Sequence, residues 1–153
     1  LLDFYIDESG ENYVILQEYI EGAEEGDVRV MMLNGKPIGA YHRKPAEGEV
    51  RANIQAGGSA HKYTLTESQK RICKKVGSKL VADGLYFVGL DMIGDKILEV
   101  NVLNPGGITN INRLNKVKLH KEVVDFLEDK VEEKVERRIE LEHLLKRLSE
   151  LRE

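Results

Sequence analysis

The stretch FVGLDMIGDKILEVNVLNP, residues 87–105, decides the fold. It reads as two strands joined by a tight turn. Side chains alternate between the two faces of a strand, so the register depends on whether the connecting loop is odd or even. A two-residue loop would place Glu99 among apolar neighbours. We therefore expect an odd loop, which forms one apolar face from Val88, Leu90, Met92, Leu98, Val100 and Val102.

The opposite face of this predicted hairpin carries three oxygen-bearing side chains, Asp91, Glu99 and Asn101. Two carboxylates that converge repel each other unless a cation compensates their charge. Carboxylate and amide oxygens suit Mg²⁺. From the spacing alone, an ordinary hairpin with its acidic face in water remains an open alternative.

Length and composition indicate one globular domain. A chain of 153 residues buries about two thirds of its unfolded surface. The net charge of -4 argues against a general nucleic-acid surface, and no stretch is apolar for long enough to span a bilayer. The single cysteine, Cys73, lies on an apolar helical face, which predicts a core thiol and fits a cytoplasmic location. Because the first residue is Leu1 rather than methionine, we expect a piece of a longer protein.

The preceding sequence contains further element signals. An apolar run over residues 13–20 predicts a buried strand. Asn34-Gly35 between apolar runs predicts a hairpin. Residues 44–63 show little periodicity, as expected for a mobile loop over a site. Thr66 and Gln69 can form a capping box for a helix that ends near residue 82.

The last segment, residues 115–153, is rich in Glu, Lys, Arg and Leu and predicts one long helix or two in series. We expect a domain over residues 1–128 and a helical extension over residues 129–153. A stripe of apolar residues runs along this extension, although its three-and-four spacing slips. The sequence leaves two alternatives for this extension. One is a coiled coil that forms a homo-oligomer, and the other is a solvated helix folded back on the sheet. The stripe consists of Val131, Val135, Ile139, Leu144, Leu148 and Leu151.

Seven short motifs between about residues 15 and 105 occur in the order and spacing of the bacterial glutathione synthetases, members of the ATP-grasp superfamily. They are QEYI, GDVRV, NGKP, RAN followed by GG, LTE, FVGLDMIGD and LEVNV. The chain thus resembles the large, C-terminal subdomain of an ATP-grasp fold. The resemblance implies an α+β architecture, with a mainly antiparallel sheet and helices on one side, followed by the long C-terminal helix.

The resemblance also implies an activity. Enzymes of this family are ATP-dependent ligases in which the γ-phosphoryl group of ATP activates a carboxylate as an acyl phosphate, and an amine then attacks to give an amide, ADP and phosphate. In glutathione synthetase the carboxylate belongs to γ-glutamylcysteine and the amine is glycine. The implied cofactor is Mg²⁺, as two ions that bridge the ATP phosphates and are held by residues corresponding to Asp91, Glu99 and Asn101.

The remaining site residues follow from the same resemblance. Residues near the transferred phosphate, which we treat as catalytic, correspond to Arg29, Arg51 and Asn53. The segment that borders adenine corresponds to Gln17, Glu18, Tyr19 and Ile20, and the acid that takes the ribose hydroxyls corresponds to Asp27. The small peptide or amino-acid substrates are expected near Arg43, Asn104, Gly106 and Gly107.

The chain departs from the family in two places. Where the family has a Ser-Pro-Thr-Cys type of segment, this chain has Asn104-Pro105-Gly106-Gly107. That turn is closer to the corresponding segment of other ATP-grasp ligases, including those that add glutamate to ribosomal protein tails. The identities of the carboxylate substrate and the amine substrate are therefore left open. No residues here match the family's N-terminal substrate domain or its lid, and we expect the chain alone to be inactive. A non-catalytic module that acts through the C-terminal helix is the competing interpretation.

Overall fold

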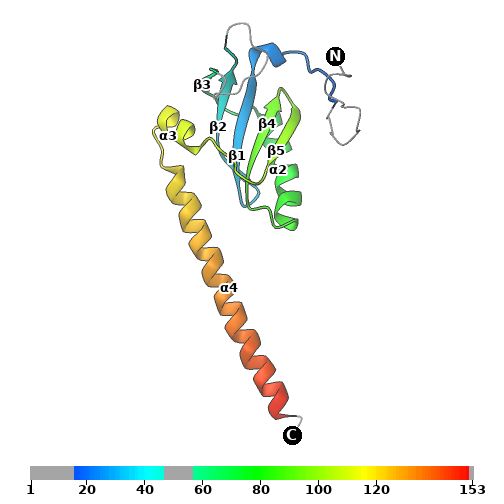
Figure 1. The fold of residues 1–153 in the computed structure, drawn as a ribbon, viewed down its shortest axis with the longest axis vertical. Coiled ribbons are helices and arrows are strands. Elements are labelled where there is room, and N and C mark those ends of the chain that lie inside the picture. Colours follow the sequence, from blue (N-terminus) through cyan, green and yellow to red (C-terminus); the bar gives the residue numbers. More distant parts are fainter. Residues whose placement is uncertain (1–15, 47–56, 152–153) are drawn as a thin grey trace, which may run out of the picture.

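The computed structural model describes residues 16–46 and 57–151. Its centre is a five-stranded antiparallel sheet with the order β3-β2-β1-β4-β5, and a long helix extends from one end (Figure 1). The α+β class predicted from the sequence is confirmed. The elements, in chain order, are η1 (Ala23–Glu25), β1 (Asp27–Leu33), β2 (Lys36–Lys44), β3 (Ser59–Lys62), α2 (Glu67–Ala82), β4 (Phe87–Ile93), β5 (Lys96–Asn101), α3 (Ile108–Asn115) and α4 (Leu119–Glu150).

The β1–β2 hairpin forms where the Asn-Gly pair predicts it. Asn34 and Gly35 have φ values of 48° and 75°, and positive φ at both central residues is what a type I′ turn requires. Pro37 lies inside β2 beside a shift of register between Met31 and Met32. A bulge of this kind tolerates a proline, because proline has no amide hydrogen to donate to the neighbouring strand.

The β4–β5 hairpin reaches the expected register only from Asp91 and Glu99 onward, because nearer the turn Met92 pairs with Ile97, which packs against the core. Ile93 pairs with Lys96 across a two-residue turn, so the odd loop predicted from the sequence is wrong. The register shifts between Asp91 and Met92, so that Asp91 pairs with Glu99. The strand β5 therefore holds one extra residue, as in a β-bulge. This bulge keeps the carboxylate of Glu99 off the apolar face while Gly94 takes the positive φ of the turn, 54°.

Helix α2 covers one face of the sheet. It begins with the predicted capping box, in which the Gln69 amide donates to Thr66 Oγ1 and the Thr66 amide donates to Gln69 Oε1, both at 3.1 Å. Cys73 on this helix is fully buried, and burial raises the pKa of its thiol. The prediction of a core thiol is confirmed. The core between α2 and the sheet contains Val28, Val30, Met32, Ala40, Cys73, Leu80, Val88, Leu90 and Met92.

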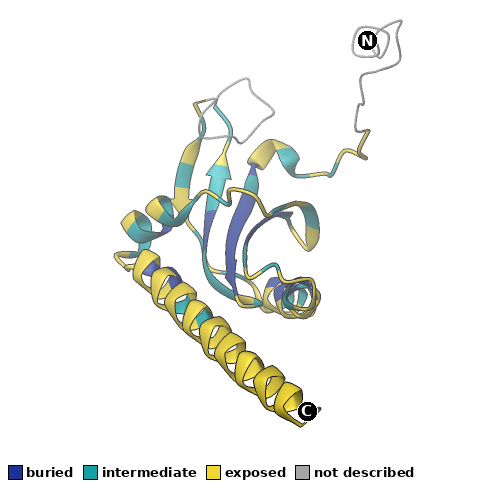
Figure 2. Cartoon of the chain, turned by 60° about the horizontal axis from the view of Figure 1, so that its bottom comes forward, coloured by how far each residue is buried: buried dark blue, intermediate teal, exposed yellow. Residues whose placement is uncertain are grey.

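A second, smaller core lies on the other face of the sheet, where α3 and the start of α4 pack (Figure 2). Its buried residues are Met31, Tyr41, Ile111 and Leu119. We expected all helices on one side of the sheet. Helix α2 covers one face, whereas α3 and the start of α4 cover the other face. The physical reason is that Met31 and Tyr41 are large apolar side chains on the second face, and α3 offers apolar residues at helical spacing to cover them.

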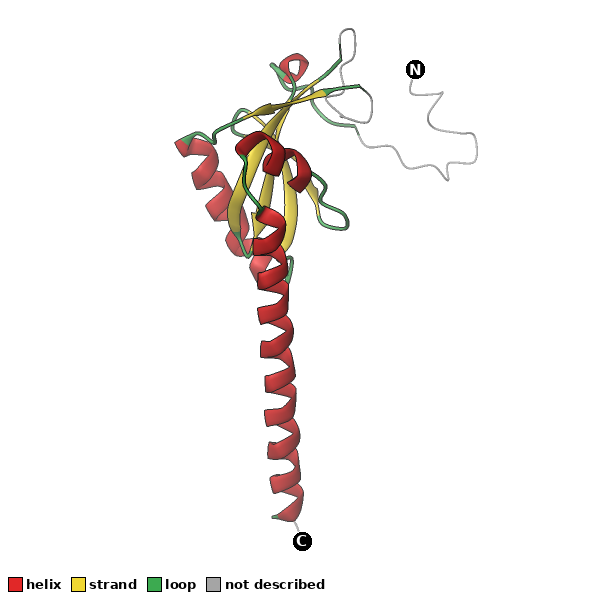
Figure 3. Ribbon diagram, turned by 90° about the vertical axis from the view of Figure 1, so that its left-hand side faces the viewer, coloured by secondary structure: helices red, strands yellow, loops and turns green. Residues whose placement is uncertain are grey.

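Helix α4 is one continuous helix that leaves the sheet after its first three turns (Figures 1 and 3). Leu119 and Val123 are buried, and the ring of Phe126 lies 5.9 Å from the ring of Tyr86. From Val131 to Glu150 every residue is exposed, so the helix does not fold back on the sheet. The expected domain boundary at residue 128 falls inside this helix, and the division of the chain there stays a prediction.

Three other expectations need correction or fall outside the description. Residues 16–20 have no strand assignment and make no sheet pairing with described residues, while residues 13–15 lie outside the description. An apolar run forms a strand only beside a partner strand.

Within the expected loop, residues 59–62 form β3, and residues 47–56 are not described. On β5, Val100 is 41% exposed, so the described residues cover the predicted apolar face only in part.

Close packing between α2 and the β1–β2 turn gives a sharp test of the fold. A Cβ atom at Gly77 would lie 2.0 Å from the carbonyl oxygen of Gly35. Helix propensity alone predicts that Gly77→Ala stabilises the protein by about 1 kcal/mol, whereas the contact predicts destabilisation by about 1–3 kcal/mol. We expect destabilisation in urea unfolding.

The matched control is Ser78→Ala, one position along the same helix, where the side chain is exposed. Alanine there should stabilise the protein slightly, because it has the higher helix propensity. A stabilised Gly77→Ala variant would contradict the close approach of the helix to the turn.

Candidate active site

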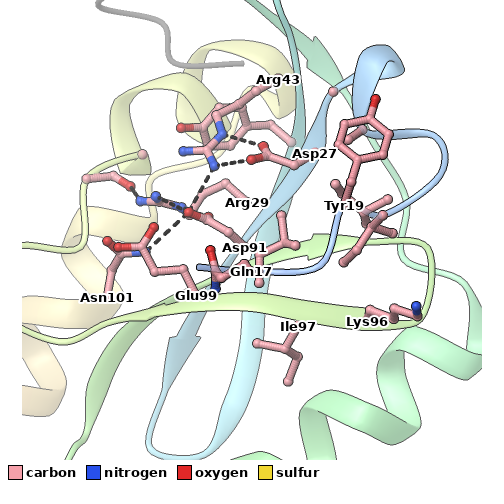
Figure 4. Close-up of a pocket in the computed structure, with 18 of the residues that line it drawn as sticks. Gln17, Tyr19, Asp27, Arg29, Arg43, Asp91, Lys96, Ile97, Glu99 and Asn101 are labelled. Carbon is pink, nitrogen blue, oxygen red and sulfur yellow. Dashed lines mark hydrogen bonds and ion pairs between the residues drawn. The ribbon is translucent and has the colours of Figure 1, made fainter. Parts of the chain in front are cut away.

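An open cavity of about 1320 Å³ lies on the face of the sheet that α3 also covers. Strands β1, β2, β4 and β5 supply its floor, and residues 17–20, the loop 104–107 and α3 supply its walls. Figure 4 shows the side chains of Arg29, Arg43, Asp27 and Asp91 gathered over the central strands. The cavity is therefore lined by charged groups on a rigid support.

The carboxylate of Asp91 is the centre of this cluster and is only 3% exposed. Arg29 donates to it through Nε and Nη2, the latter at 2.8 Å. Arg43 Nη2 lies 2.9 Å from Oδ2 of the same carboxylate, and Asn101 Nδ2 donates to Oδ2 at 3.2 Å. One buried carboxylate thus contacts two guanidinium groups.

Arg43 also contacts a second acid. Its Nε and Nη2 donate to the two oxygens of Asp27, each at 2.5 Å. Burial alone lowers the pKa of Arg43, but the hydrogen bonds to Asp27 and the charge of Asp91 outweigh burial and raise it above its ordinary value. Arg43 therefore stays charged and is held in one orientation by a bidentate contact.

The strand register brings these residues together. Arg29 pairs with Asp91 across β1 and β4, Asp27 pairs with Arg43 across β1 and β2, and Asp91 pairs with Glu99 across β4 and β5. Side chains of paired residues point to the same face. The sequence therefore places the cluster as soon as the two hairpins and their order in the sheet are formed.

The oxygen atoms around Asp91 fit a hard cation such as Mg²⁺ in chemical type. Glu99 lines the cavity, is exposed and forms no hydrogen bond or ion pair with a described residue. Asn101 contributes its amide oxygen. Asp91 already accepts from three side chains, so a metal ion beside it must compete with the arginines. Within residues 16–46 and 57–151, no group of three or more His, Cys, Asp and Glu side chains is arranged to hold a metal ion.

The loop before α3 is tied to the arginine cluster. Arg29 Nη1 donates to the carbonyl oxygen of Gly106 at 2.9 Å, and the Gly106 amide donates to the Asn104 carbonyl at 2.8 Å. Gly107 follows with φ of 133° and forms the N-cap of α3. The orientation of α3 is thus coupled to Arg29.

The segment 17–20 borders the cavity beside β5. Gln17, Glu18, Tyr19 and Ile20 line it together with residues of β5 such as Lys96 and Glu99, and Figure 4 shows Gln17 close to β5 on the side of Glu99. Tyr19 is 63% exposed, and its hydroxyl donates to Glu24 at 2.8 Å. The segment therefore borders the cavity without forming a strand of the sheet.

The structure brings most of the residues predicted from the sequence into this one cavity. It adds residues that the sequence reasoning missed, among them Tyr41, Lys96 and Asn110. Strand alternation could have found Tyr41, because it lies two residues before Arg43 on the same face. Arg51 and Asn53 lie outside the described residues. The predicted residues that line the cavity are Gln17, Glu18, Tyr19, Ile20, Asp27, Arg29, Arg43, Asp91, Glu99, Asn101, Asn104, Gly106 and Gly107.

The family model described as prokaryotic glutathione synthetase, ATP-grasp domain, matches residues 1–116 and assigns the sheet, its two hairpins and the charged cavity to an ATP-grasp domain. The chain belongs to this prokaryotic glutathione synthetase family. The match ends just before α4, which begins at Leu119. Within the helices of the described parts, none is long and apolar enough to cross a membrane.

Curated relatives agree with this assignment. The glutathione synthetase of Gloeobacter violaceus is 49% identical over 118 residues, which are 77% of this chain and 36% of the relative. That of Thermosynechococcus vestitus is 45% identical over 118 residues, 77% of the chain and 37% of the relative. The glutathione synthetase of Synechocystis is 44% identical over 119 residues, which are 78% of this chain and 37% of the relative. The chain thus spans just over a third of the length of these relatives.

Proposed function

We propose that this chain provides the nucleotide- and metal-binding part of an ATP-dependent ligase that joins a carboxylate to an amine, and that the reaction is glutathione synthesis from γ-glutamylcysteine, glycine and ATP. One observation carries the proposal. A buried carboxylate orients two arginines beside the free oxygens of Glu99 and Asn101, in a cavity bordered by the segment 17–20. The relatives named glutathione synthetase support the choice of reaction.

The arginines suit a transfer in which two anions must approach each other. Arg29 and Arg43 hold guanidinium groups over the cavity, and such groups match phosphate and carboxylate oxygens. As charge moves from the γ-phosphate toward the substrate carboxylate, fixed positive groups stabilise it without having to reorganise. From the resemblance we assign Arg29, with Arg51 and Asn53, to the transferred phosphate.

We propose that two Mg²⁺ ions are held by three residues of β4 and β5, namely Asp91, Glu99 and Asn101. When bound, the metal would neutralise the phosphate oxygens. Glu99 offers an unengaged carboxylate for this purpose, whereas Asp91 divides its oxygens between the arginines and the cation.

The nucleotide would lie at the other end of the cavity. We assign the backbone of residues 17–20 to the adenine and Asp27 to the ribose hydroxyls. Backbone recognition of adenine is compatible with the exposed side chains of this segment. Because both oxygens of Asp27 accept from Arg43, a ribose contact would share this carboxylate with the arginine and couple the nucleotide to the reacting end.

The peptide and amino-acid substrates are proposed to lie near Arg43, Asn104, Gly106 and Gly107. The Pro-Gly-Gly turn keeps a second specificity open, that of the ligases that add glutamate to ribosomal protein tails. Because the chain covers just over a third of the length of its relatives, we expect no turnover from the chain by itself. We also propose that the protein is located in the cytoplasm.

A chimera tests the function. The chain replaces the matching segment of the Gloeobacter violaceus relative, and Mg²⁺-dependent phosphate release is measured with ATP and a panel of carboxylates and amines. Release with γ-glutamylcysteine and glycine supports glutathione synthesis. Release with another pair keeps the ligase chemistry and changes the substrate. A folded chimera without release for any pair contradicts the proposal, with the unmodified relative as the positive control.

The second candidate is a binding module that self-associates through α4. The observation that favours it is the row of exposed apolar side chains beyond the sheet, which include Ile139 at 47% exposed and Leu145 at 57% exposed. Leucine and isoleucine at such spacing are typical of helix pairs. The proposed partner is a second copy of the chain.

Light scattering of the chain with and without residues 129–153 checks this candidate. Nearly all of the deleted residues are exposed, so the deletion leaves both cores intact. We expect a mass of at least two chains for the full length and of one chain for the deletion. A single-chain mass for both would contradict self-association.

A further inference from the structure

The outer part of α4 carries large apolar side chains that remain exposed. Figure 3 shows this part of the helix projecting beyond the sheet, and from Val131 to Glu150 every residue is exposed. Leu141 is 55% exposed, and Leu145 and Leu148 are each 57% exposed. So many large apolar side chains along one exposed helix mark an interaction surface.

A seven-residue repeat arranges this surface as a single seam. Counting from Val124 in alternating steps of three and four residues gives the a and d positions of a heptad, which face the partner helix in a coiled coil. Ile139 falls outside the seam, although it is also apolar. The seam is apolar except at two basic residues, and it consists of Val124, Leu127, Val131, Lys134, Arg138, Leu141, Leu145 and Leu148.

The two basic residues argue against a parallel pair of helices. In a parallel pair each seam residue faces the same residue of the second copy, so two lysines (Lys134) and two arginines (Arg138) would meet in consecutive layers. Like charges held this close in a largely apolar seam repel each other. The parallel pair would gain a flanking contact between Arg137 and Glu142, but exposed ion pairs contribute little. Glu142 also already pairs with Arg138 of its own helix at 3.4 Å.

An antiparallel pair avoids the repulsion in one register. Reversing the second helix brings a positions opposite d positions, so a basic residue can face a leucine instead of another basic residue. The aliphatic stem of each basic residue then covers the leucine while its charge reaches water. In this register the facing pairs are Val131 with Leu148, Arg138 with Leu141 and Lys134 with Leu145.

The positions that flank the seam agree with the same register, because none of them brings like charges together. In an antiparallel pair, e positions lie beside e positions and g positions beside g positions. An exposed charge therefore lies beside an uncharged residue at each of these places. The flanking pairs are Lys130 with Leu151, Arg137 with Leu144, Glu128 with Ser149 and Val135 with Glu142.

The neighbouring antiparallel registers are less favourable. A shift by one heptad toward the sheet places Arg138 opposite Lys134 and sets Glu128 beside Glu142. A shift by two heptads sets Lys130 beside Arg137. Like charges in these places oppose association.

The free length of α4 also fits the favoured register. Its C-terminal Leu151 lies level with Glu128 of the second copy. The ring contact between Phe126 and Tyr86 ties α4 to the sheet, and Glu128 lies just beyond it. The paired region, residues 128–151, is about 36 Å long at 1.5 Å per residue. The pair thus uses the part of the helix that extends beyond the sheet.

We propose that α4 binds a second copy of this chain as an antiparallel coiled coil in the register that places Arg138 opposite Leu141 and Lys134 opposite Leu145. This inference rests on the self-association proposed above and adds its orientation and register. Lys134 and Arg138 set the orientation at a cost in affinity, as polar residues in a coiled-coil seam do. The two sheets then lie at opposite ends of the paired helices.

Distances between spin labels on the two copies test the arrangement in the purified full chain. The labelled variants are Glu136→Cys and Glu150→Cys, at exposed f positions of the repeat. Glu136 lies level with His143 of the second copy and Glu150 with Asp129. We therefore expect axial offsets of about 10 Å at residue 136 and about 32 Å at residue 150, measured by double electron–electron resonance. The unmodified chain is the control and should take up no label, because Cys73 is fully buried.

Two alanine variants test the seam itself. Leu141→Ala removes a seam leucine and should raise the dissociation constant of the pair at least about 10-fold in sedimentation equilibrium. Ile139→Ala is the matched control, since Ile139 is 47% exposed but lies outside the seam. It should change the dissociation constant by less than about 3-fold.

Three outcomes would overturn the proposal. Equal short distances at residues 136 and 150 would show a parallel pair, so self-association would stand and the orientation would be wrong. Equal effects of Leu141→Ala and Ile139→Ala would refute the seam. No distance between copies at either position would refute self-association together with this arrangement. The proposed ligase is tested separately, by the chimera.

Discussion

Glu99→Gln in the chimera should reduce Mg²⁺-dependent phosphate release about 100-fold or more while leaving the free energy of unfolding nearly unchanged. Loss of a metal contact that is worth several kcal/mol in the transition state has an effect of this size. The side chain is exposed and unpaired in the described structure, so the fold does not depend on its charge. Glutamine keeps the shape and removes the anion that would bind the cation.

The measurement is the initial rate of phosphate release across a series of Mg²⁺ concentrations. A metal ligand predicts that added Mg²⁺ partly restores the rate. Glu140→Gln, an exposed acid on α4, is the control and should match the unmodified chimera. If Glu99→Gln retains the normal rate and the normal Mg²⁺ dependence, Glu99 is not a metal ligand and the acidic face of the hairpin is only a solvated surface.

Asp91→Ala should lower the free energy of unfolding of the chain by about 3–5 kcal/mol, the usual cost of removing one partner from a buried ion pair. Arg29 is 8% exposed, and without Asp91 its guanidinium would stay buried with the Gly106 carbonyl as its one remaining partner among the described residues. Arg43 would lose one of its two acids. Urea unfolding of the purified chain measures the change.

The control is Glu99→Ala on the neighbouring strand, which should change the free energy of unfolding by no more than about 0.5 kcal/mol. Equal effects of the two substitutions would show that the ion pairs at Asp91 do not stabilise the fold. If Asp91 behaves as expected, loss of activity in an Asp91 variant cannot be separated from loss of structure. Glu99 is then the residue with which the metal assignment should be tested.

Several elements could be predicted because the signal is local. Asn34-Gly35 specifies its turn through backbone conformations that few other residues adopt. Thr66 and Gln69 specify the start of α2 through hydrogen bonds between residues three apart. The register of β4 and β5 followed from the cost of burying Glu99, even though the turn and the bulge that produce it were not foreseen.

Other features depend on contacts between distant residues. The spacing indicated that Asp91 and Glu99 share a face, but it could not show that Arg29 and Arg43 occupy the oxygens of Asp91, because those arginines arrive from other strands. Tyr41 becomes a candidate site residue only when α3 closes over its ring. The strand expected over residues 13–20 did not appear at residues 16–20, since apolar character alone does not provide a neighbouring strand.

By itself the sequence determined the two hairpins, the capped helix, the acidic face and the long C-terminal helix, because each depends on residues that are neighbours in the chain or on the alternation of a strand. Only the tertiary structure decided how the charged groups pair, which face α3 covers and that α4 extends beyond the sheet. Those outcomes depend on the balance between burying a charge and pairing it, and on which surfaces can cover one another, and both are settled only when distant segments meet.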